Sequence, residues 1–412
     1  MVRRSSRLDG VNYEIRGPVY DRALALEKEG HSIIRLHIGN PAPFGFDTPE
    51  PIRRAIVANL DKAQGYAESK GTLEARQAIR QYYLAKGIAG VNTENIFIGN
   101  GVSDLILMGL QGLLEPGDEV LLPTPDYPLW TSAVRLHGGR PVHYRCDEAA
   151  DWYPDPADIR RQITARTRAI VLINPNNPTG AVYSDELLAE IVDIAREHHL
   201  LIFSDEIYDK ILYDGLTHTP TAALAPDVVC VTMSGLTKNY RAAGFRAGWL
   251  VVSGPPRDTA SYVEGLTLLA NMRVCSNAIA QQAIKTALEG YQCIDDLVLP
   301  AGRLLRQRDL AVRMIRQTPG LSCTVPKGAF YLFAKIDLKR FDFQNDTEFV
   351  INLLTEEKVL VVQGSGFNHP TPDHFRVVFL PTEAELTEGL RRIGSFLRRH
   401  TKVSASVLEE QK

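Results

Sequence analysis

Three short segments, in fixed order along the chain, hold the side chains best suited to chemistry. They are residues 174–180 (Asn-Pro-Asn-Asn-Pro-Thr-Gly), 204–208 (Ser-Asp-Glu-Ile-Tyr) and 235–246 (Gly-Leu-Thr-Lys-Asn-Tyr-Arg-Ala-Ala-Gly-Phe-Arg). Each follows an apolar run with the composition of a β-strand, so each set of polar side chains stands at the end of a predicted strand. Together they supply an amide, a carboxylate, a phenol, a lysine amine and an arginine guanidinium.

These groups match the functional groups of pyridoxal 5′-phosphate. An amine can bond to the aldehyde of this cofactor, a carboxylate can hold its ring nitrogen, donors can bind its ring hydroxyl, and a cation can hold its phosphate. The three segments resemble those of the class I/II aminotransferases, which depend on this cofactor, and the resemblance runs from residue 13 to residue 376. It implies fold type I of the pyridoxal-phosphate enzymes and a homodimer with shared active sites.

Lys238 is the predicted catalytic residue. Its amine would form an imine with the cofactor aldehyde and would then carry a proton between the substrate Cα and the cofactor. A lysine in a polar loop is more often simply solvated. Here, however, Arg246 follows at the interval typical of the family, at the start of an apolar run where its guanidinium could hold phosphate oxygens.

Asp205 ends the apolar run 200–204 and is the predicted partner of the ring nitrogen. Holding that nitrogen protonated makes the ring an electron sink. The alternative is a helix N-cap, since residues 207–211 could begin a helical turn. Tyr208, three positions later, favours the cofactor because its phenol is placed to donate to the ring hydroxyl.

Two further segments point to the same ligand. Prolines fix the turn around Asn177, so its amide can be presented without adaptation; by resemblance it contacts the ring hydroxyl and the substrate carboxylate. Residues 99–103 follow a predicted strand and open a helix, so the backbone of Val102 and the hydroxyl of Ser103 are expected to bind the cofactor phosphate. As a dinucleotide fingerprint this turn is incomplete, because Asp104 stands in place of the third glycine.

The remaining site residues follow from the resemblance alone. It implies that Tyr127 stacks on the cofactor ring and that Tyr66 reaches the phosphate from the partner subunit. It also implies that Arg376 clamps the substrate carboxylate and that the backbone of Gly39 lies against the substrate. A strand arginine such as Arg376 is otherwise more often a solvated edge charge. Arg16, beside a Gly-Pro pair in the N-terminal arm, is our hypothesis for the residue that meets the distal carboxylate of glutamate; the alternative is a solvated arm charge.

Three strings, residues 38–47, 125–130 and 205–214, resemble those of alanine transaminases. The reaction implied is L-alanine plus 2-oxoglutarate giving pyruvate plus L-glutamate, by a ping-pong route through pyridoxamine phosphate. The pocket selects the outcome, so an aminotransferase for aspartate, aromatic or branched amino acids, or a β-lyase on the same fold, stays an alternative.

Other classes of function fit less well. A nicotinamide-dependent dehydrogenase would need a complete Gly-x-Gly-x-x-Gly turn and would leave Lys238 unexplained. A ligand-sensing module would need an added DNA-binding segment, and the residues before position 49 are too few and too broken by proline and glycine. No metal is expected, because the adjacent His198 and His199 would lie on different helix faces and no His-Glu-x-x-His occurs.

The elements that must position these residues are mostly buried strands. Apolar runs predict strands at residues 95–98, 119–122, 142–145, 169–173, 200–203, 228–232 and 248–252, with helices between several of them, as at 104–114 and 186–198. Near-continuous apolar strands separated by helices indicate an α/β fold with a seven-stranded, mostly parallel sheet. Active sites in such sheets lie at the carboxyl ends of the strands.

The pattern changes after a helical stretch at residues 281–288. A long helix is predicted at 300–317, short strands at 330–334, 359–362 and 375–379, and a closing helix at 383–398. We therefore expect residues 49–290 to form a large cofactor-binding domain and residues 291–402 a smaller α+β domain. Residues 1–48 are expected to form an N-terminal arm and part of the small domain, and residues 403–412 a disordered tail.

The bulk composition agrees with a cytoplasmic enzyme. The 412 residues are 44% apolar and 23% charged, with a formal net charge of −3, so neither a nucleic acid nor a membrane is an expected partner. Five cysteines without Cys-x-x-Cys spacing indicate free thiols in a reducing compartment.

Overall fold

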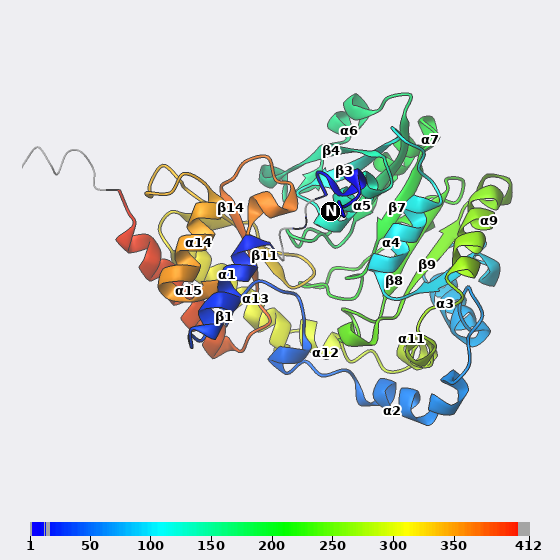
Figure 1. Cartoon of the computed structure of the whole chain (residues 1–412), viewed down its shortest axis with the longest axis horizontal. Coiled ribbons are helices and arrows are strands. Elements are labelled where there is room, and N and C mark those ends of the chain that lie inside the picture. Colours follow the sequence, from blue (N-terminus) through cyan, green and yellow to red (C-terminus); the bar gives the residue numbers. More distant parts are fainter. Residues whose placement is uncertain (1, 12, 14–16, 403–412) are drawn as a thin grey trace, which may run out of the picture.

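The structure, a computed structural model, describes residues 2–11, 13 and 17–402. A large mixed sheet with helices on both faces makes up one part of the molecule, and a small antiparallel sheet with its own helices makes up the other (Figure 1). The predicted tail, residues 403–412, and Arg16 lie outside the described residues. No helix within these ranges is long and apolar enough to cross a membrane.

The large sheet has the strand order β2-β9-β8-β7-β6-β3-β4-β5. In that order the strands are Ile96–Gly99, Gly248–Ser253, Cys230–Gly235, Leu201–Asp205, Thr167–Ile173, Glu119–Thr124, Arg140–Asp147 and Tyr153–Pro154. All seven predicted runs are strands, and of these only β9 runs in the direction opposite to the other six. The predicted mostly parallel α/β sheet is thus confirmed. The two-residue β5 was missed because it is too short for an apolar pattern.

Both faces of this sheet are buried, which is why its strands read as nearly continuous apolar runs. Within β2, for example, Phe97 belongs to one core while Ile96 and Ile98 belong to the core on the opposite face. The first face is covered by α4 (Val102–Gln111), α5 (Pro128–Leu136) and α9 (Pro256–Met272), and the second by α3 (Leu73–Ala85), α7 (Asp185–Glu197) and α11 (Ile284–Glu289). The loops at the strand ends are thereby held between two packed layers.

The small sheet has the antiparallel order β10-β11-β14-β13. Its strands are Leu321–Cys323, Tyr331–Ile336, His374–Val378 and Val362–Gln363, and its main helices are α13 (Arg303–Gln317), α14 (Asp346–Glu357) and α15 (Glu383–Arg399). The single strand predicted at 359–362 is wrong. Its first half, β12 (Val359–Leu360), pairs instead with β1 (Ile34–Arg35), so the segment joins two different sheets.

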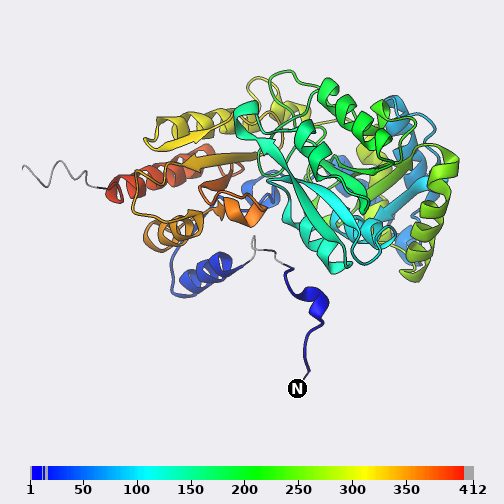
Figure 2. The ribbon, with the colours of Figure 1, turned by 90° about the horizontal axis from the view of Figure 1, so that it is seen from above.

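The beginning of the chain packs with its end. Helix α1 (Pro18–Lys28) places Val19, Ala23 and Leu26 in the same core as α14 and α15. Ahead of α1, Arg135 of α5 donates to the backbone carbonyl of Gly10, so the chain touches the large part there, while the first residues extend away from it (Figure 2). This shared core supports our proposal that part of residues 1–48 belongs with residues 291–402.

Candidate active site

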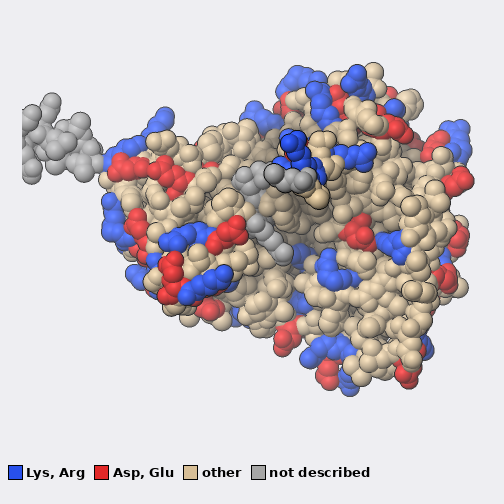
Figure 3. All heavy atoms as spheres, viewed as in Figure 1, with Lys and Arg blue, Asp and Glu red and all other residues tan. Residues whose placement is uncertain are grey.

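A cavity of about 570 Å³ lies between the two parts, at the carboxyl ends of the large sheet's strands. The surface is hollowed there (Figure 3). The predicted site residues that line it are Gly39, Val102, Ser103, Tyr127, Asn177, Asp205, Tyr208, Lys238, Arg246 and Arg376. Tyr66 does not line it and is 88% exposed to solvent. Residues more than 300 positions apart thus meet in one site.

Lys238 lies in the loop that follows β8. Its Nζ donates to the backbone carbonyl of Gly39 at 2.7 Å. Burial lowers the pKa of the Lys238 amine, and the charges of Arg376 and Arg246 lower it further. The amine therefore gives up its proton more readily than a solvated lysine does, as a nucleophile requires.

Gly39 is required by its close surroundings. A Cβ on this residue would lie 2.3 Å from the Tyr331 hydroxyl and 2.6 Å from the Phe330 ring. Only a glycine lets the main chain pass close enough to accept the hydrogen bond from Lys238.

Asp205 is the last residue of β7 and is buried. Its Oδ2 accepts a hydrogen bond from Trp130 Nε1 at 3.2 Å. Burial raises the pKa of the Asp205 carboxyl to about 6, against the opposing effects of Trp130 and Lys238. No helix begins in residues 206–220, so the N-cap alternative is wrong. A bound cation would stabilise the charged form of this carboxylate.

Two tyrosine pairs stand in the cavity. The hydroxyls of Tyr208 and Tyr331 are hydrogen-bonded at 2.6 Å, and those of Tyr127 and Tyr13 at 2.9 Å. Burial raises the pKa of the Tyr208 and Tyr127 phenols well above the usual value, so both stay neutral and either hydroxyl of each pair can be the donor. Sequence reasoning missed Tyr331 and Tyr13, because an aromatic residue in a strand or an arm carries no signal that separates a site from a core.

Arg246 and the N-terminus of α4 form an anion site. The Arg246 guanidinium donates to the backbone carbonyls of Ala243 and Asn100 at 3.0 and 2.9 Å, and no described carboxylate pairs with it. A Cβ at Gly101, where φ is +88°, would lie 2.2 Å from Arg246 Nη2. Glycine therefore lets the guanidinium lie directly against the first turn of α4, where backbone N–H groups favour a negative charge.

Arg376 lies on β14, between β11 and β13, and is only 2% exposed. It donates from Nη1 to Asn177 Oδ1 at 2.7 Å and from Nη2 to the backbone carbonyl of His37 at 2.6 Å. Its Nε has no hydrogen-bond partner, and no carboxylate of the described ranges pairs with it. The alternative of a solvated edge charge is thus wrong. A buried arginine without a counter-ion is suited to an anionic ligand such as a carboxylate.

The charges of the cavity define the ligand it suits. Lys238, Arg246 and Arg376 face it, and among the described residues that line it Asp205 is the only one with a carboxylate. One arginine comes from the large part and the other from the small part. The site is therefore built for a compound with anionic groups, held beside a reactive amine and a flat aromatic surface.

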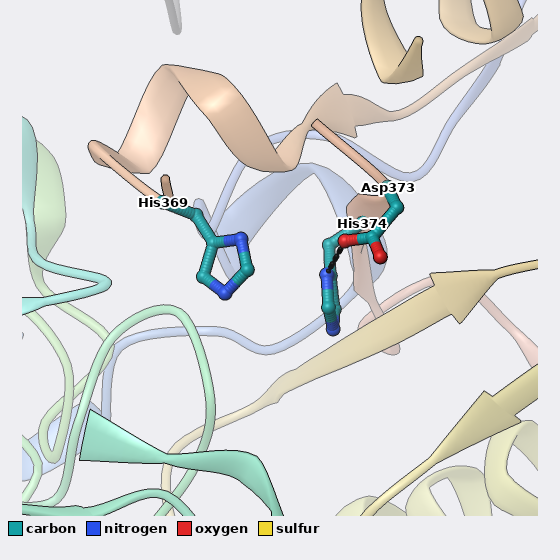
Figure 4. Close-up of side chains that lie close together, drawn as sticks. All are labelled: His369, Asp373 and His374. Atoms are coloured by element: carbon teal, nitrogen blue, oxygen red, sulfur yellow. Dashed lines mark hydrogen bonds and ion pairs between the residues drawn. The ribbon is translucent and has the colours of Figure 1, made fainter. Parts of the chain in front are cut away.

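A cluster of potential metal ligands lies elsewhere, at His369, Asp373 and His374 (Figure 4). His374 Nδ1 lies 2.6 Å from Asp373 Oδ1, and its Nε2 lies 3.5 Å from Glu148. Burial opposes the charged imidazole, but these two carboxylates raise the pKa of His374 overall. Glu148 belongs to the large part and also pairs with Lys335 of the small sheet, at 3.0 Å, so we interpret the cluster as an ion-pair link between the two parts. The expectation that the chain uses no metal stays a prediction.

Comparison with known proteins identifies the family. The sequence model of the family "Aminotransferase class I and II" matches residues 31–393. The chain is 56% identical over 394 residues to a glutamate-pyruvate aminotransferase of Haemophilus influenzae, covering 96% of this chain and 98% of that protein. It is 54% identical over 395 residues to an alanine aminotransferase of Mycobacterium bovis, covering 96% and 92%.

Comparison of three-dimensional structures supports the same family. A crystal structure of an aminotransferase from Escherichia coli superposes with a TM-score of 0.96 at 54% sequence identity, covering 98% of this chain and all of that one. The chain therefore belongs to the class I and II aminotransferases, whose cofactor is pyridoxal 5′-phosphate.

Proposed function

We propose that the protein transfers the amino group of L-alanine to 2-oxoglutarate, giving pyruvate and L-glutamate. The observation that carries the proposal is the meeting of two side chains in one cavity. Lys238 has an amine with a lowered pKa, and the buried Arg376 has no counter-ion among the described residues. Such a pair suits an α-amino acid, whose carboxylate needs a cation and whose Cα proton needs a base. The names of the closely similar proteins support alanine and glutamate as the substrates.

The residues of the cavity fit pyridoxal 5′-phosphate. Arg246, the first turn of α4 and Ser103 would hold the phosphate, because this arginine has no carboxylate partner among the described residues. Asp205 would face the ring nitrogen, with Tyr208 at the ring hydroxyl. Asn177 would share that hydroxyl, and Tyr127 would cover a face of the ring.

Bound there, the cofactor supplies an aldehyde that captures the amino group and a protonated ring that withdraws electrons from the substrate Cα. The protein supplies the positions. Arg376 would hold the α-carboxylate, and Asn177, already bonded to Arg376, would contact one of the carboxylate oxygens. Lys238 would be the base that moves the proton between Cα of the substrate and C4′ of the cofactor. The main chain at Gly39 limits the space beside the substrate.

Arg16 is proposed to meet the distal carboxylate of glutamate and 2-oxoglutarate. Its neighbours in the chain support this: Tyr13 is hydrogen-bonded to Tyr127 in the cavity, and α1 begins at Pro18 in the small part.

A homodimer with shared active sites is proposed for the assembly. Large apolar side chains are exposed on one region of the large part, namely Val57, Leu60, Tyr66, Leu268, Met272, Val274 and Ile279. Contacts between α10 (Ala278–Gln281) and the turn Leu60–Ala63, and the hydrogen bond of Ser69 to Asn271, join these segments. Apolar exposure of this kind is typical of a subunit interface.

The free cysteines support a cytoplasmic location.

An absorption spectrum of the purified protein, titrated first with L-alanine and then with 2-oxoglutarate, tests the proposal. We expect the yellow band of the lysine-bound cofactor to fade with alanine and to return with 2-oxoglutarate, since each compound drives one half of the reaction. A yellow protein that alanine leaves unchanged would reject the substrate and direct the search to other amino acids. Release of ammonia would favour a lyase. A protein that gains no band with added cofactor would overturn the assignment of the site.

A further inference from the structure

A buried carboxylate links the two loops that carry Lys238 and Tyr208. Asp209 follows Tyr208 in the chain and is 4% exposed; Asn239 follows Lys238 and is 2% exposed. Asn239 Nδ2 donates to Asp209 Oδ1 at 2.6 Å. One short hydrogen bond thus joins the loop that holds the amine to the turn that holds the phenol.

Helix α3 anchors this carboxylate from the side away from Lys238. Asp209 Oδ2 accepts hydrogen bonds from the Tyr82 hydroxyl, at 2.7 Å, and from Lys86 Nζ. Tyr82 lies in α3 and Lys86 is its C-cap. Burial alone would raise the pKa of Asp209, but the charge of Lys86 and these hydrogen bonds hold it at about 2. The group is therefore charged at neutral pH and makes the stronger, charge-assisted kind of hydrogen bond.

Stability gives little reason to keep such an ion pair. Asp209 is buried while Lys86 is 22% exposed, and the cost of burying a charge offsets much of the attraction that the pair gains. On the side of Lys238, the Asn239 side chain makes no hydrogen bond other than the one to Asp209: its Oδ1 is buried and has no partner among the described residues. The orientation of this amide is thus set by Asp209.

Lys238 and Tyr208 have other hydrogen-bond partners, but these lie outside the large sheet. Lys238 Nζ donates to Gly39 in the N-terminal segment, and the Tyr208 hydroxyl bonds Tyr331 of the small sheet. The bond between Asp209 and Asn239 joins two loops of the large part directly. It therefore holds the two groups relative to one another independently of the small part.

We propose that Asp209 is a positioning residue. Through Asn239 it fixes the loop of Lys238, and through its own backbone it fixes Tyr208, so that the amine and the phenol keep one spacing. Neither Asp209 nor Asn239 lines the cavity, so both act only through their neighbours. The inference rests on the proposed function, since it assigns those neighbours to the cofactor aldehyde and ring hydroxyl.

The test compares two donors to the same carboxylate in the holoenzyme. Asn239→Ala removes the donor on the side of Lys238 and leaves Asp209 paired with Lys86. Tyr82→Phe, the matched control, removes a donor on the side of α3. For Asn239→Ala we expect kcat to fall by about 10- to 100-fold with KM changed less than about threefold, because small misplacement of a reacting group costs rate more than binding. For Tyr82→Phe we expect kcat within about twofold of the parent.

A second readout does not depend on turnover. Without substrate, the pH at which the absorption of the lysine-bound cofactor changes should shift in Asn239→Ala and stay constant in Tyr82→Phe. Because it needs no amino acid, this readout still tests the inference if alanine is the wrong substrate. If Asn239→Ala does not fold, Asn239→Ser replaces it, since a serine hydroxyl is too short to make the bond.

Three outcomes would overturn the proposal. If kcat fell equally in the two variants, in step with a fall in their melting temperatures, Asp209 would have only a structural role. Parent values of kcat and of the pH midpoint in Asn239→Ala would show that the bond positions nothing. A rise in KM with kcat unchanged would place its effect on binding instead.

Discussion

The two arginines of the cavity pair with no carboxylate of the described part of the chain, but they are held in different ways. Arg246 donates to two backbone carbonyls next to a helix N-terminus, so its positive charge is available to a phosphate. Arg376 is fixed by one side chain and one carbonyl and lies over the rings of Tyr331 and Phe367, 4.4 and 4.6 Å from their centroids. These aromatic faces hold the guanidinium flat, which suits a planar carboxylate.

The stacking of Arg376 leads to a prediction for Arg376→Lys. A lysine keeps the charge but loses the planar fork and the stacking, so it binds a carboxylate as a point charge. We expect the KM for alanine to rise by about 10- to 100-fold, since the loss of a charged hydrogen bond costs about 1.5–3 kcal/mol. The absorption of the lysine-bound cofactor should stay the same. A matching loss of bound cofactor would contradict the assignment of Arg376 to the substrate alone.

Arg16→Gln tests which substrate the arm meets. Glutamate and 2-oxoglutarate carry a second carboxylate, whereas alanine and pyruvate carry a methyl group at that place. We therefore expect the KM for the two dicarboxylates to rise about tenfold or more while the KM for alanine stays within about twofold. Steady-state kinetics in both directions give the four constants. An equal rise for glutamate and alanine would show that Arg16 does not meet the distal carboxylate.

At the scale of elements, the carboxyl end of β7 concentrates unusual acid groups. Next to Asp205, Glu206 is completely buried, and its Oε1 accepts hydrogen bonds from Ser204 Oγ at 2.8 Å and from the backbone N–H of Thr221 at 3.0 Å. Its Oε2 has no partner. Burial raises the pKa of Glu206 to about 8, although the charge of Lys86 opposes this. The carboxyl is therefore mainly protonated at neutral pH.

This raised pKa makes the stability of the fold depend on pH. The unfolded chain releases the Glu206 proton near pH 4.5 and the folded chain near pH 8. The contribution to stability is thus fully present below pH 4.5 and is lost as the pH rises through about 8. We expect the free energy of unfolding to fall by on the order of a few kcal/mol across this window through Glu206.

Denaturant unfolding of Glu206→Gln between pH 5 and pH 9, on the holoenzyme, measures that fall. Glutamine cannot titrate, so the decline with pH should be shallower than in the parent. A buried amide in place of Oε2 lowers the free energy of unfolding by an amount that does not depend on pH. The test therefore compares how steeply this free energy falls with pH, not its absolute value. Titrating groups that the substitution does not touch give both proteins the same residual slope. Parallel curves would show that Glu206 is charged in the folded state at neutral pH.

The sequence was informative where local pattern sets the structure. Buried strands flanked by polar motifs placed Lys238, Asp205 and Asn177 at strand ends, and the structure brings these three side chains into one cavity. The sequence could not reveal hydrogen bonds between segments that lie far apart in the chain. Asp209 reads as one more charged residue after Tyr208, and only packing brings Asn239 to it, 30 positions away. Short edge strands such as β5 and β10 fail for a related reason: pairing, not apolar period, makes them strands.

At the scale of the whole molecule, the active site joins the two parts, and several bonds fix their arrangement around it. Asn368 of the small part donates to Asp126 at 2.7 Å, and Thr124 donates to the backbone carbonyl of Asn368 at 2.7 Å. Asp126 precedes Tyr127, and Asn368 follows Phe367, the ring beneath Arg376. These two hydrogen bonds thus hold Tyr127, the predicted ring-stacking residue, in place relative to Phe367, whose ring lies beneath Arg376. The exposed Tyr66, by contrast, does not line the cavity of its own chain.

Mixed dimers test whether Tyr66 completes the site of the partner. One chain carries Lys238→Ala and the other Tyr66→Phe, and the two are co-expressed with different tags so that the mixed dimer can be purified. If Tyr66 acts across the interface, one site of this dimer carries both changes and the other carries none. At limiting cofactor we then expect close to half the parent's activity, well above either altered homodimer, because an intact site keeps its phosphate contact. If Tyr66 serves its own chain, every site is altered, and the mixed dimer reaches no more than half the activity of the Tyr66→Phe protein.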